Sequence, residues 1–150
     1  MSITAKDFFS LKEQEEIRLA IQNAELDTSG EIRVHVENLC KGDVLDRAAY
    51  IFKQLGMEKT EQRNGVLIYL AIKDRKFAII GDMGINSVVP AGFWDDIKQE
   101  MLISFQMNEF CTGLCNAVES VGEHLKKYFP YTKDDVNELK DDISFGNDGK

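Results

Sequence analysis

The chain reads Val66-Leu67-Ile68-Tyr69-Leu70-Ala71-Ile72 near its middle, an unbroken apolar run. A strand that is apolar on both faces is typical of the centre of a sheet that helices cover on both sides. The polar turn Lys73-Asp74-Arg75 follows, and Phe77-Ala78-Ile79-Ile80 then repeats the apolar pattern. Because the connection is so short, the two runs most simply pair as an antiparallel hairpin.

The part of the chain before this hairpin predicts a helix, a strand and a second helix. Ser10 to Glu13 has the spacing of a capping box, and apolar residues at helical spacing follow it as far as Thr28-Ser29-Gly30. Gly42-Asp43 starts a second helix that ends at Gly56. Between these two helices, apolar and polar residues alternate, which indicates a strand with one solvated side. Its apolar face carries Ile32, Val34 and Val36, and its polar face carries Glu31, Arg33, His35 and Glu37. A right-handed crossover through the second helix makes the first two strands parallel neighbours.

Two more helices are predicted over Phe93 to Gln106 and over Glu109 to Tyr128, before Pro130 closes the helical region. The order α-β-α-β-β-α-α predicts an α/β fold, a three-layer α/β/α sandwich around a small mixed sheet. We expect one domain over residues 1–130. Residues 131–150 form an acidic C-terminal tail with few apolar side chains, which we expect to drape over the domain or to fray.

Composition restricts the class of function. With 26 acidic and 18 basic side chains the net charge is -8, and without a local cluster of Lys and Arg this disfavours nucleic-acid binding. No stretch has the length and apolarity of a signal peptide or a membrane-spanning helix, so we expect a cytoplasmic protein without a membrane partner. Cys40, Cys111 and Cys115 form an odd set and are expected as free thiols.

The predicted topology brings three strand ends to one edge of the sheet, namely the starts of the first two strands and the end of the third. Four oxygen-bearing side chains lie there: Ser29, Glu31, Asn64 and Asp82. Asp95, with Asp96 beside it, opens the next helix and would add carboxylates. Such ligands suit a hard divalent cation, calcium in the first place and magnesium as the alternative. Four of these residues also have a simpler explanation, since Asn64 and Asp82 are of types that favour turns, and Asp95 and Asp96 are acidic residues in the first turn of a helix.

The motifs of the common enzyme classes are absent. The sequence has no GxxxxGK[ST] phosphate loop, no GxSxG elbow and no HExxH helix, and Asp135-Val136-Asn137 does not continue into an EF-hand loop. His35 and His124 lie on different predicted elements, so we assign them no metal role. No catalytic residue is predicted, and no cofactor other than a divalent cation.

Several segments resemble the TPM domain family, over about Phe8 to Phe129. They are Thr28 to Val34, Arg63 to Ile68, Ala78 to Ile85 and Gly113-Leu114. The resemblance implies an α/β sandwich of the order derived above and a cleft at Asn64 and Asp82 that takes divalent cations, with phosphatase activity proposed for the plant branch. Many members carry an export signal and a membrane anchor. Because this sequence shows neither, we expect a cytosolic, stand-alone version.

Three functions remain open at this point. The first is a non-catalytic domain that binds a divalent cation and acts as an interaction or regulatory module, with another protein as its partner. The alternative is a metal-assisted phosphatase with Asp82 or Asp95 as nucleophile or base, which would also need a basic residue such as Arg63 at the phosphate. The third is a protein-interaction domain without a ligand. In the first case, we expect the carboxylates of Glu31, Asp82 and Asp95 to repel one another when no metal is bound.

Overall fold

The computed structural model describes residues 4–131 and 143–146, and its elements follow the predicted order with short additions. The helices are α1 (Ala5–Phe8), α2 (Leu11–Glu25), α3 (Val44–Gln54), the 3-10 helix η1 (Met57–Lys59), α4 (Met83–Asn86), α5 (Asp95–Gln106) and α6 (Phe110–Tyr128). The strands are β1 (Glu31–Glu37), β2 (Gly65–Ala71), β3 (Lys76–Gly81) and β4 (Ile143–Phe145). The short elements α1, η1, α4 and β4 were not predicted from the sequence.

The strands form one mixed sheet in the order β3-β2-β1-β4. β1 runs parallel to β2, from Glu31 opposite Gly65 to Glu37 opposite Ala71, and β2 runs antiparallel to β3. The predicted crossover and the predicted hairpin are both confirmed. Every residue of β2 is buried, as the unbroken apolar run requires of a central strand.

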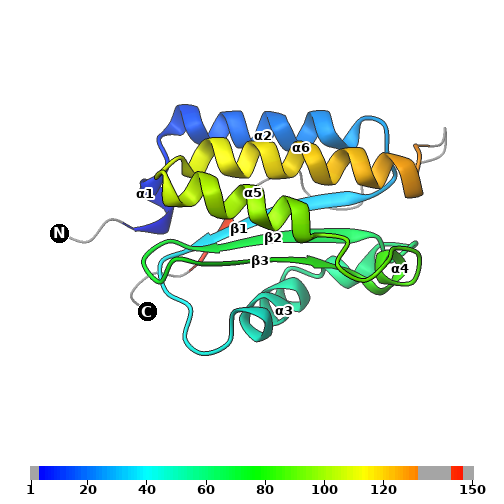
Figure 1. The fold of residues 1–150 in the computed structure, drawn as a ribbon, viewed down its shortest axis with the longest axis horizontal. Coiled ribbons are helices and arrows are strands. Elements are labelled where there is room, and N and C mark those ends of the chain that lie inside the picture. Colours follow the sequence, from blue (N-terminus) through cyan, green and yellow to red (C-terminus); the bar gives the residue numbers. More distant parts are fainter. Residues whose placement is uncertain (1–3, 132–142, 147–150) are drawn as a thin grey trace.

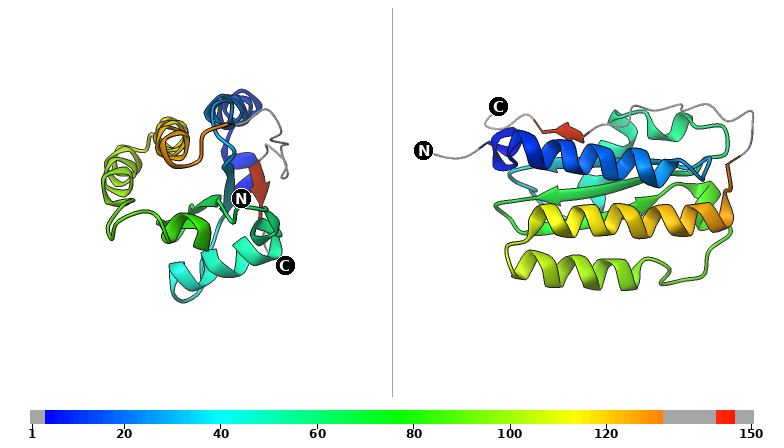
Figure 2. Two further views of the ribbon diagram at one scale, coloured as in Figure 1. Left: turned by 90° about the vertical axis from the view of Figure 1, so that its right-hand side faces the viewer. Right: turned by 90° about the horizontal axis from the view of Figure 1, so that it is seen from above.

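Helices cover both faces of this sheet, which confirms the three-layer α/β/α sandwich. α2, α6 and α5 lie side by side over one face, and α3 lies against the other (Figure 1, Figure 2). The larger core lies under the three helices and includes Ile17, Ile21, Val34, Ile68 and Leu114. The smaller core lies under α3 and includes Ala48, Phe52, Leu67, Tyr69 and Ala78. None of the described helices is both long and apolar enough to cross a lipid bilayer.

The starts of α2 and α3 follow directly from their sequences. The Ser10 hydroxyl accepts the N–H of Glu13 at 3.0 Å, and the Glu13 carboxylate accepts the N–H of Ser10 at 3.0 Å, which completes the capping box. Asp43 caps α3 by accepting two backbone N–H groups through Oδ1. Gly56 follows α3 with a φ of 70°, in the left-handed region that glycine adopts without strain.

The polar side of β1 is buried, so the prediction of a solvated face is wrong. Glu31, His35 and Glu37 are only 3%, 4% and 4% exposed. Side chains from α3 and from β4 reach over this face, among them Arg47 and Ser144. Alternation identified the strand correctly but not its surroundings, because polar side chains can be buried when they are hydrogen-bonded to one another.

The strand β4 corrects part of the prediction for residues 131–150. Ile143–Phe145 lies parallel to β1, with Val34 opposite Ile143, and so adds a fourth strand to the sheet. Ile143 is buried and Phe145 packs against the larger core, which gives this short segment an apolar anchor. The rest of the predicted tail, residues 132–142 and 147–150, lies outside the described residues.

Candidate functional site

The predicted edge of the sheet is present, and the strand register defines it. Glu31 pairs with Gly65, and the N–H of Asp82 donates to the Gly65 carbonyl at 3.0 Å. Residues that pair across strands point to the same face of a sheet, so these three positions form one row on the face that α3 covers. The predicted meeting of the three strand ends is therefore confirmed.

Ser29 and Asn64 are in contact at this edge. The Asn64 side-chain amide donates to Ser29 Oγ at 3.3 Å, and the Gln62 amide donates to the same oxygen at 3.2 Å. Asn64 is 1% exposed, and its backbone N–H donates to Thr60 Oγ1 at 3.2 Å. The segment before β2 thus has an internal hydrogen bond, and it is also hydrogen-bonded to Ser29 near the start of β1.

The carboxylate of Asp82 is held by Arg63. Arg63 Nε donates to Oδ2 at 2.7 Å and Nη2 donates to Oδ1 at 2.9 Å, which is a bidentate pair. Asp82 Oδ1 also accepts the N–H of Met83 at 2.8 Å and so caps α4. The Asp82 side chain is 6% exposed, whereas that of Arg63 is 37% exposed. A buried negative charge is therefore balanced by an arginine that remains in contact with water, which removes the basis for expecting unbalanced repulsion at Asp82.

The backbone places Arg63 in front of this carboxylate. Its φ is 52°, and its carbonyl accepts the N–H of Gly84 at 2.9 Å. A Cβ on Gly84 would stand 2.1 Å from the Gln62 carbonyl oxygen and 2.6 Å from that of Arg63. Only glycine at position 84 lets α4 approach the turn so closely. The same contact holds the Arg63 backbone against α4, the helix that Asp82 caps.

The predicted carboxylate ligands are not gathered around one point. The backbones of β1 and β3 are roughly 10 Å apart, two strand spacings, and Met57 of η1 lies over the glycine between them. The Met57 carbonyl oxygen is 3.3 Å from the place where a Cβ of Gly65 would stand. Met57 therefore lies between Glu31 and Asp82 on this face of the sheet. Within residues 4–131 and 143–146, no group of three or more Asp, Glu, His or Cys side chains is placed to hold a metal ion.

Asp95 and Asp96 are exposed and lie in the first turn of α5, where negative charge stabilises a helix. Asp95 Oδ2 is 2.8 Å from the place where a Cβ of Gly92 would stand, so this carboxylate folds over the loop that precedes α5. Trp94 packs beside Gly81, with its Cζ2 3.2 Å from the corresponding position. The start of α5 thus lies at the predicted end of the sheet, but the simpler explanation accounts for the two aspartates.

Comparison with known families agrees with this arrangement, since the TPM domain matches residues 3–124. The chain belongs to the TPM domain family.

The solved BA42 protein of the psychrophilic bacterium Bizionia argentinensis is 45% identical, with a TM-score of 0.88 over 94% of this chain and 97% of that chain. An N-terminal domain from P. gingivalis is 19% identical, with a TM-score of 0.65 over 81% of this chain and 78% of that chain. The N-terminal domain of cg2496 from Corynebacterium glutamicum is 18% identical, with a TM-score of 0.63 over 79% of this chain and 74% of that chain. These last two likenesses show the fold alone, and no curated protein matches the chain.

This TPM domain has a second polar site, on the buried side of β1, that was not predicted from the sequence. We call it the buried cluster, and it consists of His35, Glu37, Arg47, Tyr69 and Ser144. Glu37 accepts hydrogen bonds from Arg47 Nε at 2.8 Å and Nη2 at 2.9 Å, and the Tyr69 hydroxyl also donates to it. His35 Nε2 lies 3.3 Å from Glu37 Oε1, and His35 Nδ1 lies 2.7 Å from Ser144 Oγ. Because a carboxylate only accepts, Nε2 carries a proton in this arrangement. The parallel register places His35 beside Tyr69, but only the folded structure reveals Arg47 and Ser144.

The buried cluster holds Glu37 in its ionised form. Burial would raise the pKa of Glu37, but hydrogen bonds from His35, Arg47 and Tyr69 outweigh it and lower the pKa to about 2. Burial and the hydrogen bond to Glu37 raise the pKa of Tyr69, so its hydroxyl stays protonated. With the carboxylate ionised and the phenol protonated, the cluster binds β4 and α3 to the sheet and offers neither group as a base near neutral pH.

The thiols of this TPM domain are free, as predicted. Burial raises the pKa of Cys111 and that of Cys115. Because the thiolate is the nucleophilic form, neither residue is activated for covalent catalysis.

Proposed function

We propose that this TPM domain binds a divalent cation, calcium in the first place and magnesium as the alternative, at the edge that holds Ser29, Asn64 and Asp82. Glu31 and Asp95 remain candidate ligands from either side of that edge. The bound and free forms would differ in the surface they offer to another protein, so the domain would act as an interaction or regulatory module without a catalytic step. A cytoplasmic location is part of the same proposal.

The observation that supports this proposal best is the way in which Asp82 is neutralised. A buried carboxylate needs a positive charge beside it, and here the charge comes from an arginine side chain that is 37% exposed. A divalent cation is smaller than a guanidinium group and would supply the positive charge that the Asp82 carboxylate needs. It would also find the oxygen atoms of Ser29 and Asn64 at the same edge, which are of the type that calcium prefers.

Cation binding at Asp82 requires the Arg63 side chain to leave. The Arg63 backbone is held by Gly84, so the exchange would move the guanidinium and leave the turn in place. Competition with this resident cation lowers the affinity for metal. It also gives binding a consequence, because the displaced guanidinium becomes available at the surface for an acidic group of a partner.

A metal-assisted phosphatase is the second candidate, and the same arginine bears on it. A phosphatase needs a guanidinium or ammonium group that can reach the phosphoryl oxygens, whereas Arg63 donates both Nε and Nη2 to Asp82. Displacement by a metal would free Arg63 for that task, so turnover has to be measured with metal present. A protein-interaction domain without any ligand is the third candidate.

Calcium and then magnesium titrations of the purified protein, followed by backbone amide shifts, test the proposal directly. The expected shifts cluster at Gly30–Glu31, Asn64–Gly65 and Gly81–Asp82, and the Arg63 Nε–H resonance moves as its carboxylate partner is lost. The absence of any response at millimolar calcium and magnesium would remove the proposed function. Shifts confined to the exposed Asp95 and Asp96 would place the cation at the start of α5 instead.

A further inference from the structure

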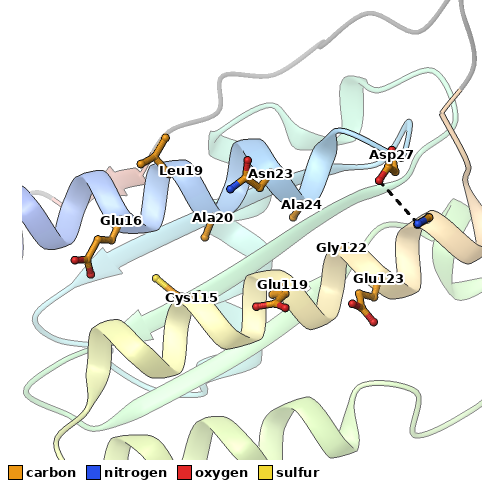
Figure 3. A pocket seen from close by; sticks show the side chains of 11 residues that line it. Glu16, Leu19, Ala20, Asn23, Ala24, Asp27, Cys115, Glu119, Gly122 and Glu123 are labelled. Atoms are coloured by element: carbon orange, nitrogen blue, oxygen red, sulfur yellow. Dashed lines mark ion pairs between the residues drawn. The ribbon is translucent and has the colours of Figure 1, made fainter.

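A groove runs between α2 and α6 on the side of these helices that faces away from the sheet (Figure 3). Its volume is about 610 Å³, and its lining includes none of Ser29, Asn64 or Asp82. The helical residues that face the opposite way, such as Ile17, Ile21 and Val121, are buried in the larger core. The groove is therefore a feature of the outer surface that is separate from the edge discussed above.

The floor of the groove is made of small side chains. Ala20 and Ala24 of α2 face Cys115 and Gly122 of α6 across it (Figure 3). The helices approach closely there, since a Cβ on Gly122 would stand 2.6 Å from the Cβ of Ala24. A floor without large side chains allows a further helix to lie close to both helices. Leu19, which is 49% exposed, adds a large apolar side chain to the lining.

The walls of the groove are acidic. Glu16 of α2 and Glu119 and Glu123 of α6 are exposed glutamates in the lining, and Asp27 stands at one end. Lys126 is the basic residue of the lining, with its Nζ 3.9 Å from Asp27 Oδ2 (Figure 3). Both partners of that pair are exposed, so the pair is weak and easily exchanged. The groove thus combines an apolar floor with an excess of carboxylates.

We propose that this groove binds an amphipathic helix of a partner protein, with a narrow apolar face flanked by lysine or arginine. The apolar face would cover Ala20, Ala24 and Gly122, while the basic flanks would reach Glu16 on one wall and the α6 glutamates on the other. From Cys115 to Lys126 the groove follows about 16 Å of helix axis, which a partner helix of about three turns would cover.

The acidic walls and the apolar floor of the groove together favour a basic amphipathic helix over other occupants. Carboxylate walls on a chain of net charge -8 repel nucleic acid, anionic lipid and a second copy of the same chain. A solvated acidic surface would attract any cation, whereas a floor of Ala, Gly and Cys with an exposed Leu19 also favours the removal of water by an apolar face. A basic amphipathic helix satisfies both requirements.

The probe for this proposal is a helical peptide of about 14 residues, with alanine and leucine on one face and lysine on both flanks. A peptide of the same composition in scrambled order controls for charge alone. Binding of the ordered peptide should shift the amide resonances of Ala20, Ala24 and Gly122. It should also slow the alkylation of Cys115, which lines the groove, while Cys40 and Cys111 are buried away from reagent.

Two pairs of matched variants locate the binding. Glu119→Lys reverses a charge in the wall, and Glu100→Lys makes the same change at an exposed glutamate of α5 outside the groove. We expect roughly tenfold weaker peptide binding for Glu119→Lys and less than about a twofold change for Glu100→Lys. Ala20→Trp, which fills the floor without changing charge, should abolish binding, while Ala49→Trp on the exposed side of α3 should not.

Equal weakening by the two charge reversals, or equal affinity of the scrambled peptide, would overturn the proposal in favour of general charge attraction. Broadening of the groove resonances with protein concentration and no peptide would identify a second copy as the occupant and overturn it as well. Calcium does not enter these measurements, so their failure would leave the proposed cation site untouched.

Discussion

Arg63 faces Asp82 with two parallel hydrogen bonds of 2.7 and 2.9 Å from a backbone held at a φ of 52°. The hydrogen bond to Asp82 raises the pKa of Arg63, so the guanidinium stays charged at any pH at which the protein is folded. A permanent cation therefore stands where a divalent cation would have to bind. In the proposed function, the strength of the Arg63–Asp82 pair limits the affinity of this edge for a metal ion, and metal binding would release the Arg63 side chain.

Arg63→Gln should raise the affinity for calcium, because the variant removes the competing cation and leaves Asp82 in place. Arg75→Gln is the matched control. Arg75 also has a φ of 52°, is exposed, and lies in the β2–β3 turn at the other end of the sheet. Isothermal titration calorimetry at fixed ionic strength measures both affinities. A similar gain in the two variants would attribute the effect to net charge and would contradict competition at Asp82.

Asp82→Asn should lower the melting temperature of the metal-free protein. The substitution removes the counter-charge of Arg63 and weakens the cap of α4. Repulsion among the carboxylates, taken alone, would instead predict a neutral or stabilising change. Calcium should stabilise the wild type by RT ln(1 + [L]/Kd), about 2.7 kcal/mol at a hundredfold excess over Kd, and most of this gain should disappear in the variant. Thermal unfolding with and without calcium provides both comparisons. A variant that keeps the full calcium response would show that Asp82 is only a structural residue.

The architecture could be predicted because its signals are local. The apolar run at β2, the capping box at Ser10 and the glycine after α3 each report on a few neighbouring residues, and the handedness rule then orders the strands. Contributions from distant segments could not be predicted in this way. β4 is held by Ile143 and by the hydrogen bond between Ser144 and His35, and nothing near residue 143 in the sequence indicates which strand it joins.

The candidate site was predictable to the same extent. Topology alone implied that the starts of β1 and β2 and the end of β3 share one edge, and the strand register then places Glu31, Gly65 and Asp82 in one row. The pairing of Arg63 with Asp82 depends on a left-handed backbone and on the close approach of Gly84, which are properties of the folded turn. The placement of Met57 between Glu31 and Asp82 likewise follows from how η1 packs. Residue types therefore suggested which side chains could be metal ligands, and packing determines which of these side chains lie close together.

Turnover of a generic phosphomonoester such as p-nitrophenyl phosphate should be slow or absent, with or without calcium or magnesium. Without metal, Arg63 is engaged with Asp82. With metal bound, the sequence still shows no motif of the common enzyme classes that would supply a nucleophile, and Glu37 of the buried cluster is held ionised by its hydrogen bonds. Steady-state assays at several protein concentrations measure this. Robust, metal-dependent activity that is lost in both Asp82→Asn and Asp95→Asn would establish the phosphatase and contradict the non-catalytic role.

Glu37 should make the stability of the fold sensitive to acid. Its pKa is lowered from 4.5 to about 2 in the folded protein, so protonation favours the unfolded chain. The stabilising contribution is complete above about pH 4.5 and is lost as the pH falls from there to about 2. A shift of this size corresponds to about 3 kcal/mol in the free energy of unfolding.

Glu37→Gln removes that titration, so its free energy of unfolding should change less between pH 4.5 and pH 2 than that of the wild type, by about 3 kcal/mol. The variant should also be less stable at neutral pH, because Arg47 loses its counter-charge. Glu100→Gln, at an exposed position of α5, is the control and should keep the wild-type dependence. Urea unfolding at a series of pH values gives the required free energies. If the difference between wild type and Glu37→Gln stays constant across this range, Glu37 does not carry the low pKa, and the hydrogen bonds from His35, Arg47 and Tyr69 do not outweigh its burial.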